Sequence, residues 1–299
     1  MEVVLAGASG LIGSALKRSL LGDGHRVKTL LRRPAEGPDV DSWDPARGLL
    51  DPDFLEGADA VVCLSGVGVG DHRWTDTYKR EIVQSRVDSV GTVAGTMADL
   101  IADGRRGPRV LVAASAVGYY GDTGDVEVDE ATPAGDSFLS EVCVQWEAAA
   151  DPARRAGARV THLRTGLVLS KEGGLLKRLV PIVKAGIGGK LGDGRQYMPW
   201  ISLADEVSAI RFLLDHDLAG AVNLTGPDPV RNAELTKILG RLLHRPTVFP
   251  VPGFAAKLAL GEFADDVLSG QRAVPRRLLD AGFQFADRDL ESALRAELA

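Results

Sequence analysis

Short runs rich in apolar residues recur along the chain, and the segments between them have a different pattern. The runs cover residues 3–6, 26–31, 60–64, 110–114, 160–163 and 221–224. Between several of them the apolar positions follow helical spacing, as in residues 14–21 and 77–102. Nearly continuous apolar strands that alternate with helices are typical of a parallel sheet covered on both faces. The pattern predicts an α/β fold with a doubly wound parallel sheet of the Rossmann type.

The character of the chain changes near residue 186, where glycine becomes frequent. Residues 186–194 are glycine-rich and either cover a ligand or simply connect two elements. We expect a Rossmann domain over residues 1–170, to which residues 200–226 return. The rest of residues 171–299 is expected to form a smaller, α-rich substrate lobe.

Composition and charge limit the kinds of binding partner and the cellular location that we expect for this protein. There are 35 Lys and Arg against 41 Asp and Glu, for a net charge of −6, and no long basic run occurs, so nucleic acid is not expected as a partner. No apolar stretch is long enough to span a bilayer and a strand begins directly after Met1, so we expect a cytoplasmic protein without membrane contact. The five histidines lack metal-ligand spacing, so no metal is expected. Cys63 and Cys143 are expected to be separate reduced thiols. A homodimer is compatible with the sequence, which does not determine the oligomeric state.

A turn with three glycines follows the first apolar run and precedes a helical pattern. In a dinucleotide-binding unit the first glycine permits the tight turn, the second lets the backbone approach the pyrophosphate, and the third allows helix and strand to pack closely. Amide groups at the start of the helix then face the phosphates. The turn could instead be purely structural, but the order of strand, turn and helix favours a dinucleotide site. The expected contact residues are Gly7, Ser9, Gly10, Leu11, Ile12 and Gly13.

The end of the second predicted strand indicates which dinucleotide binds. An NAD site usually places an acidic residue there for the ribose hydroxyls, whereas this chain has Arg32 and Arg33. A guanidinium can pair with a 2′-phosphate, so NADP(H) is favoured over NAD(H). A solvated basic pair at a strand end is the alternative. Topology also places Leu64, Ser65 and Ser115 at the ligand-bearing edge, because they end or follow two buried strands.

Motifs along the whole chain resemble the extended short-chain dehydrogenase/reductase superfamily, and within it the atypical epimerase-like family with a C-terminal domain of unknown function. They are residues 7–13, Arg73-Trp74 with Ser85-Arg86, residues 115–121, Trp146-Glu147, residues 164–166, residues 192–200 and residues 229–232. The resemblance implies NADP(H) binding. It also implies cofactor contacts by Leu31, Arg32, Leu64, Ser65, Glu81, Arg86 and Val168. Glu81 and Arg86 are five residues apart on one predicted helix, so an ordinary solvated helix surface is the alternative for these two.

The chain departs from the superfamily in its proton-transfer residues. Extended reductases and epimerases normally carry Tyr-x-x-x-Lys on the helix after the fifth strand. Here the corresponding residues 137–143 contain neither a Tyr nor a Lys. Ser115 remains, and Tyr120 follows closely enough to act as a substitute acid, so we expect these two as the catalytic residues. A Tyr-Gly pair at this place is often structural in the superfamily, which is the alternative for Tyr120.

These features predict an NADP(H)-dependent oxidoreductase or epimerase-like enzyme that acts on a small polar substrate, of which a sugar is one example. Arg195 and Gln196 follow the glycine-rich segment and are the expected substrate contacts. The alternative is an NADP(H)-binding protein with little or no turnover and a structural or regulatory role. The missing Tyr and Lys favour the alternative, whereas the intact glycine turn, Ser115 and Arg195-Gln196 favour the enzyme.

Overall fold

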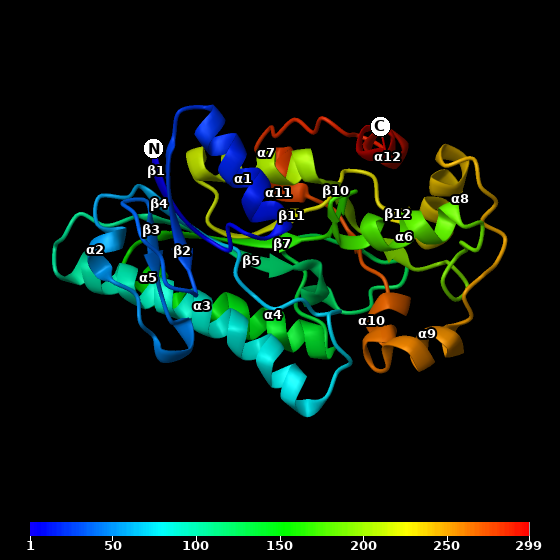
Figure 1. Ribbon diagram of the computed structural model, residues 1–299, viewed down its shortest axis with the longest axis horizontal. Helices are drawn as coiled ribbons and strands as arrows, with labels where there is room; N and C mark the ends of the chain where they lie inside the picture. The colour runs from blue at the N-terminus through cyan, green and yellow to red at the C-terminus, as the bar shows by residue number, and fades with distance from the viewer. Residues whose placement is uncertain (299) are drawn as a thin grey trace.

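A seven-stranded parallel sheet forms the centre of the computed structural model, which describes residues 1–298 (Figure 1). From one edge to the other, the strands are β11 (Gly220–Leu224), β7 (Arg159–Thr165), β5 (Val110–Ala116), β4 (Ala60–Cys63), β1 (Glu2–Ala6), β2 (Arg26–Leu31) and β3 (Val40–Ser42). The strand order reverses between β1 and β4, where a doubly wound sheet opens its ligand-binding crevice. The predicted Rossmann-type fold is therefore confirmed.

Helices cover both faces of the sheet (Figure 1). One face carries α1 (Leu11–Gly22), α7 (Leu203–Asp215) and α11 (Arg276–Asp280). The other carries α2 (Pro52–Leu55), α3 (Asp76–Ala102), α4 (Phe138–Ala148) and α5 (Asp151–Arg155). Side chains along β1 alternate between the two resulting cores, with Val3 and Leu5 in one and Val4 and Ala6 in the other. Both faces of the strand are buried, which explains why it is apolar throughout.

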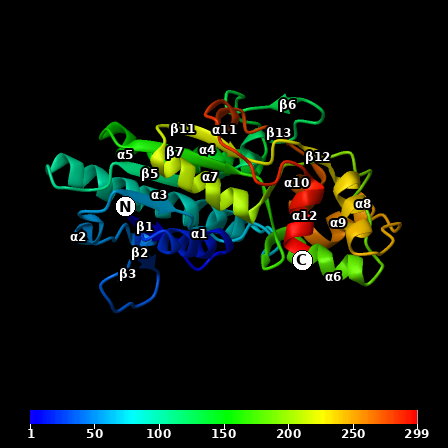
Figure 2. The same ribbon diagram turned by 90° about the horizontal axis from the view of Figure 1, so that it is seen from above.

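The C-terminal lobe lies beside the carboxyl ends of the strands and has its own core (Figure 2). Its helices are α6 (Gly174–Lys184), α8 (Asn232–Leu242), α9 (Gly253–Leu260), α10 (Phe263–Leu268) and α12 (Leu290–Leu298). Short strand pairs connect it, formed by β8 (Leu167–Ser170) with β10 (Trp200–Ser202) and by β9 (Tyr197–Met198) with β12 (Val230–Arg231). Trp200 is almost fully buried in this core. No helix within residues 1–298 has both the length and the apolar character needed to cross a bilayer.

The chain returns from the lobe to the Rossmann sheet twice. The first return, through α7 and β11, lies within the expected residues 200–226. The second was not expected from the sequence. Here β13 (Arg272–Ala273) pairs with β6 (Glu127–Val128), and Leu278, Phe283 and Phe285 pack into the same core as β1. Part of the C-terminal region thus belongs physically to the Rossmann domain.

Candidate functional site

Backbone conformation and close packing require glycine at two positions of the turn between β1 and α1. Gly7 has a φ of +88°, and a Cβ atom on it would lie 2.8 Å from the carbonyl carbon of Leu64. A Cβ on Gly13 would lie 2.2 Å from the carbonyl oxygen of Gly7. Both glycines are therefore required by the packing of the protein itself.

No steric constraint within the protein requires a glycine at Gly10. It is exposed, and a Cβ there would meet one atom within 4 Å, the Gly7 oxygen at 3.4 Å. Gly10 is also the N-cap of α1, and no side chain of residues 1–298 caps the amide groups of that helix end. An open backbone with free amide donors is suited to a phosphate group. This favours the dinucleotide interpretation of the turn over the purely structural one.

A cavity of about 420 Å³ lies beside the end of β2. Arg32 and Glu81 both line it, so the structure brings together two residues that the resemblance implicated separately. Asp44 and Asp88 line it too, whereas the neighbouring Arg33 does not. Sequence reasoning missed both aspartates, because they come from the segment after β3 and from the middle of α3. The cavity offers one guanidinium and several carboxylates to a ligand.

Arg86 lies beneath the same edge as a buried positive charge. Its guanidinium donates to the carbonyl oxygens of Ile82 and Val67, both at 2.9 Å, and stacks 4.9 Å above the Trp146 ring. No carboxylate among residues 1–298 lies within ion-pair distance of it, and burial lowers its pKa. Arg86 is thus neither a solvated surface residue nor part of the cavity lining. A buried cation without a counter-charge is favourable for an anionic ligand at this edge.

Other implicated residues gather around one apolar cluster at the carboxyl ends of the strands. Ile12, Leu64 and Val168 are partly buried and pack against the same core. Val168 lies on β8 opposite Ile201 of β10. Ser65 follows Leu64 and Leu31 ends β2, so both also lie at this edge. Ser9 is exposed in the turn, and Leu11 points toward Gly173.

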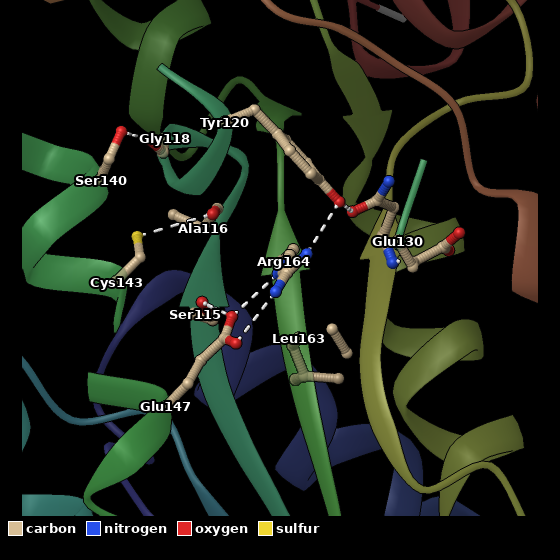
Figure 3. Close-up of polar contacts among 12 residues, drawn as sticks. Ser115, Ala116, Gly118, Tyr120, Glu130, Ser140, Cys143, Glu147, Leu163 and Arg164 are labelled. Atoms are coloured by element: carbon tan, nitrogen blue, oxygen red, sulfur yellow. Dashed lines mark hydrogen bonds and ion pairs between the residues drawn. The ribbon is translucent and has the colours of Figure 1, made fainter. Parts of the chain in front are cut away.

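Ser115 and Tyr120 belong to a buried polar network (Figure 3). The Ser115 hydroxyl donates to Glu147 at 2.7 Å, and Arg164 donates to both carboxylate oxygens of Glu147 at 2.9 and 3.0 Å. Arg164 also donates to the Tyr120 hydroxyl at 3.1 Å, which in turn donates to Asn223 at 2.7 Å. Burial raises the pKa of Glu147, but the Arg164 hydrogen bonds and charge outweigh this, so its pKa is lowered overall.

The contacts in this network affect whether Ser115 and Tyr120 can take the catalytic roles expected of them. Ser115 and Tyr120 are each only 4 % exposed, and both hydroxyls have partners within the protein. Burial raises the pKa of Tyr120 to about 12, against the lowering influence of Arg164. These contacts fit the structural alternative for Tyr120 and make proton exchange with a ligand unfavourable in this arrangement. Catalysis by the two hydroxyls stays a prediction.

The helix that normally carries Tyr-x-x-x-Lys is present as α4, with apolar residues in place of the ionisable ones. Phe138 packs edge-on against Trp74, with ring centroids 4.9 Å apart, and Val142 is buried beside Tyr78. The Cys143 thiol contacts the Ala116 carbonyl oxygen at 3.6 Å, and burial raises its pKa to about 11. It is therefore protonated near neutral pH. None of these three side chains supplies an acid or base at the end of β5.

A second cavity, of about 330 Å³, contains the two expected substrate residues. Arg195 lies 3.8 Å from Asp125, and the Gln196 amide donates to the Leu191 carbonyl oxygen at 3.2 Å. Three aspartates that the sequence reasoning missed, Asp122, Asp125 and Asp193, share the cavity. Asp122 and Asp125 are near neighbours in the sequence, but Asp193 lies far along the chain in the glycine-rich segment, so sequence spacing carries no signal that the three come together.

The glycine-rich segment beside this cavity is largely held by packing. A Cβ on Gly189 would lie 1.9 Å from the Phe249 carbonyl oxygen, and Leu191 forms a β-bridge with Val251. The Leu191 amide also donates to Asn232 at 2.8 Å. These contacts connect the segment to two other parts of the lobe. They support its role as a connector and leave its covering role a prediction.

The fold, the open glycine turn and the reversal of strand order between β1 and β4 together define a Rossmann-type protein of the dinucleotide-binding class. Residues 3–225 match the model of the NAD dependent epimerase/dehydratase family, and residues 251–297 match a domain of unknown function, DUF1731. The chain belongs to the NAD dependent epimerase/dehydratase family, as its resemblance predicted.

Individual relatives match nearly the whole of this chain. Epimerase family protein MT2273 from Mycobacterium tuberculosis is 46% identical over 294 residues, covering 98% of this chain and 96% of the relative. The human epimerase family protein SDR39U1 (isoform 2), solved with NADPH, superposes with a TM-score of 0.87 at 31% identity, covering 99% of both chains. A nucleoside-diphosphate sugar epimerase from Corynebacterium glutamicum superposes with a TM-score of 0.80 at 34% identity, covering all of this chain and 58% of that one.

Proposed function

We propose that the chain is an NADP(H)-dependent oxidoreductase or epimerase-like enzyme that acts on a small polar substrate. The observation that carries the proposal is the open Gly10 at the uncapped start of α1, because the packing of the protein gives no reason for a glycine there. The human relative solved with NADPH supports the same cofactor. When bound, this cofactor supplies or accepts a hydride at its nicotinamide ring.

Different residues along the edge of the sheet would bind different parts of the cofactor. The amide groups of residues 11–13 would hold the pyrophosphate beside the open Gly10, and the guanidinium of Arg32 would pair with the 2′-phosphate. The uncompensated charge of Arg86 would favour the anionic cofactor from below the loop after β4. Leu64 and Val168 would contact its apolar surfaces. In this proposal the second cavity holds the substrate, with Arg195 and Gln196 as hydrogen-bonding groups.

A second function, NADP(H) binding with little or no turnover, is supported by one observation. The only hydroxyls that the sequence reasoning nominated for proton transfer, those of Ser115 and Tyr120, are buried and already paired with protein groups. The apolar Phe138 and Val142 add no replacement. In this alternative the cofactor would serve as a structural or regulatory ligand.

Cofactor choice is tested by calorimetric titration of the purified chain with NADPH and with NADH. We expect NADPH to bind at least about tenfold more tightly, which corresponds to about 1.4 kcal/mol. Arg32→Ala should remove most of this preference, because Arg32 lines the cavity at the end of β2. Arg33→Ala is the matched control and should retain it. Equal affinities for the two nucleotides in the unmodified chain would contradict the proposal.

Catalysis is tested separately, by following NADPH oxidation and NADP⁺ reduction with a panel of sugars, nucleotide sugars and other small carbonyl compounds. The enzyme proposal predicts turnover with at least one member, and turnover should fall in Arg195→Ala if the second cavity holds the substrate. Tight NADPH binding without turnover across the panel would instead support the non-catalytic function.

A further inference from the structure

We propose that residues 66–75, here called the strap, couple the dinucleotide site to helices α9 and α10 of the C-terminal lobe. The inference rests on the proposed NADP(H) binding and concerns how that site is regulated. The strap starts directly after Leu64 and Ser65, which are expected to contact the cofactor, and ends at Thr75, the N-cap of α3. It therefore leads from the cofactor edge of the sheet toward the lobe.

Side-chain hydrogen bonds hold residues 67–70 of the strap. Four consecutive carbonyl oxygens each accept a hydrogen bond from a different side chain. Arg86 donates to Val67 at 2.9 Å, Tyr78 to Gly68, Trp74 to Val69 at 2.8 Å, and Arg178 to Gly70 at 3.3 Å. Arg86 and Tyr78 belong to α3 of the Rossmann domain, Trp74 belongs to the strap itself, and Arg178 belongs to α6 of the lobe. Residues 67–70 are thus held between α3 of the Rossmann domain and α6 of the lobe, which gives a continuous path of contacts between the two.

The far end of the strap is attached to the lobe by contacts that are polar and aromatic. Arg73 donates to the Leu258 carbonyl oxygen of α9 at 3.2 Å, and the rings of Trp74 and Phe263 lie 5.3 Å apart. Just beyond the strap, Lys79 of α3 forms an ion pair with Glu262 before α10. Figure 1 shows α9 and α10 beside the N-terminal end of α3.

The near end of the strap borders the proposed cofactor site, because Val67 lines the cavity at the end of β2 together with Arg32. The close approach of Gly7 involves not only Leu64 but also the Ser65 amide nitrogen, which a Cβ on Gly7 would meet at 3.1 Å. A dinucleotide that reaches from the turn to Arg32 would therefore contact Val67 of the strap as well. Coupling between two sites is reciprocal, so cofactor binding should stabilise the lobe contacts and loss of those contacts should weaken cofactor binding.

Hydrogen exchange followed by mass spectrometry, with and without NADPH, tests the coupling in the full chain. NADPH should slow amide exchange both in residues 7–13 and in residues 253–268. In Phe263→Ala and in Arg178→Ala we expect slowing to persist in residues 7–13 but to be lost in residues 253–268. NADPH affinity should fall at least about fivefold in both variants.

Matched controls separate this coupling from general damage to the lobe. Phe254→Ala removes an aromatic side chain of α9 that is 76% exposed. Arg241→Ala removes an arginine whose side chain is 62% exposed, the same fraction as Arg178. Both controls should behave like the unmodified chain.

The outcomes also distinguish the coupling from the proposed function. NADPH-dependent slowing in residues 7–13 without any in residues 253–268 of the unmodified chain would overturn the coupling and leave cofactor binding intact. Unchanged protection and affinity in Phe263→Ala and Arg178→Ala would also overturn it. Absence of any slowing or heat of binding with NADPH would overturn the proposed function and the coupling together.

Discussion

Glu206 is the most deeply buried carboxyl group beside the cofactor edge. It has no solvent exposure, and one of its oxygens accepts a hydrogen bond from Thr165 at 2.9 Å, while the other has no partner within residues 1–298. Burial raises its pKa to about 8, and the Thr165 bond only partly offsets this. Glu206 is therefore protonated at neutral pH. Its first-turn position on α7 lies at the end of β7, close to where the proposed cofactor would bind.

This burial predicts a pH-dependent stability. The folded pKa of about 8 exceeds the ordinary value of 4.5, so the contribution of Glu206 to stability is complete below pH 4.5. It is lost as the pH rises toward 8, by roughly 1.4 kcal/mol per pH unit at most. Glu206→Gln should flatten this part of the profile of unfolding free energy, measured with urea at several pH values. Glu172→Gln, at a carboxylate whose side chain is 60% exposed, is the control. Parallel profiles for the unmodified chain and Glu206→Gln would refute the assignment.

At the scale of secondary-structure elements, the network around Glu147 connects four parts of the Rossmann domain. Ser115 lies on β5, Glu147 on α4, Arg164 on β7 and Asn223 on β11. Hydrogen bonds join Ser115 to Glu147, Arg164 to Glu147, and Tyr120 to Asn223. All of these groups are buried or partly buried. Hydrogen bonds of this kind fix the relative positions of the elements, because breaking one leaves a buried partner unsatisfied.

Tyr120→Phe and Ser115→Ala should therefore lower the free energy of unfolding, by about 1–3 kcal/mol each. NADPH affinity should change little, because neither hydroxyl faces the glycine turn or the cavity at β2. Denaturant unfolding and calorimetric titration measure the two quantities. A variant with unchanged unfolding free energy and a fall in turnover of about 10²-fold would instead assign its hydroxyl to catalysis.

At the scale of the whole molecule, the C-terminal region completes the Rossmann domain. Arg277 donates to the Ala221 carbonyl oxygen of β11 at 2.6 Å, and Glu130 accepts from the amides of Asn223 and Arg277. Phe283 is only 7% exposed and packs in the core beneath the sheet. Residues far apart in sequence thus share one core, and we expect them to unfold together.

Phe283→Ala should cost about 3–5 kcal/mol of unfolding free energy, the usual range for removing a buried phenylalanine ring. Phe249→Ala, at a ring that is 58% exposed, should cost much less. A single transition should be seen when Rossmann and C-terminal probes are followed by hydrogen exchange in denaturant. Separate transitions for residues 1–170 and for residues 276–285 would show that the C-terminal region folds as an independent unit.

Local features of the sequence determined the sheet and the dinucleotide turn. A strand buried on both faces must be apolar along its length, so β1 and β4 could be predicted from apolar runs in the sequence. The spacing of Gly7, Gly10 and Gly13 depends on a backbone path of only a few residues. Arg32 could be nominated as a cofactor contact because its place after β2 is a local property of the βαβ unit.

Only the tertiary structure decided what the nominated side chains contact. Ser115 lies on β5 and Tyr120 lies in the short helical turn that follows it, yet their partners come from α4, β7 and β11. Arg86 was nominated, but its burial without a counter-charge depends on how α3 packs against the loop after β4. The second return of the chain to the sheet could not be predicted from the sequence either, because a short buried segment shows no repeating pattern of apolar positions. Side-chain environment depends on distant elements, and these meet only when the chain folds.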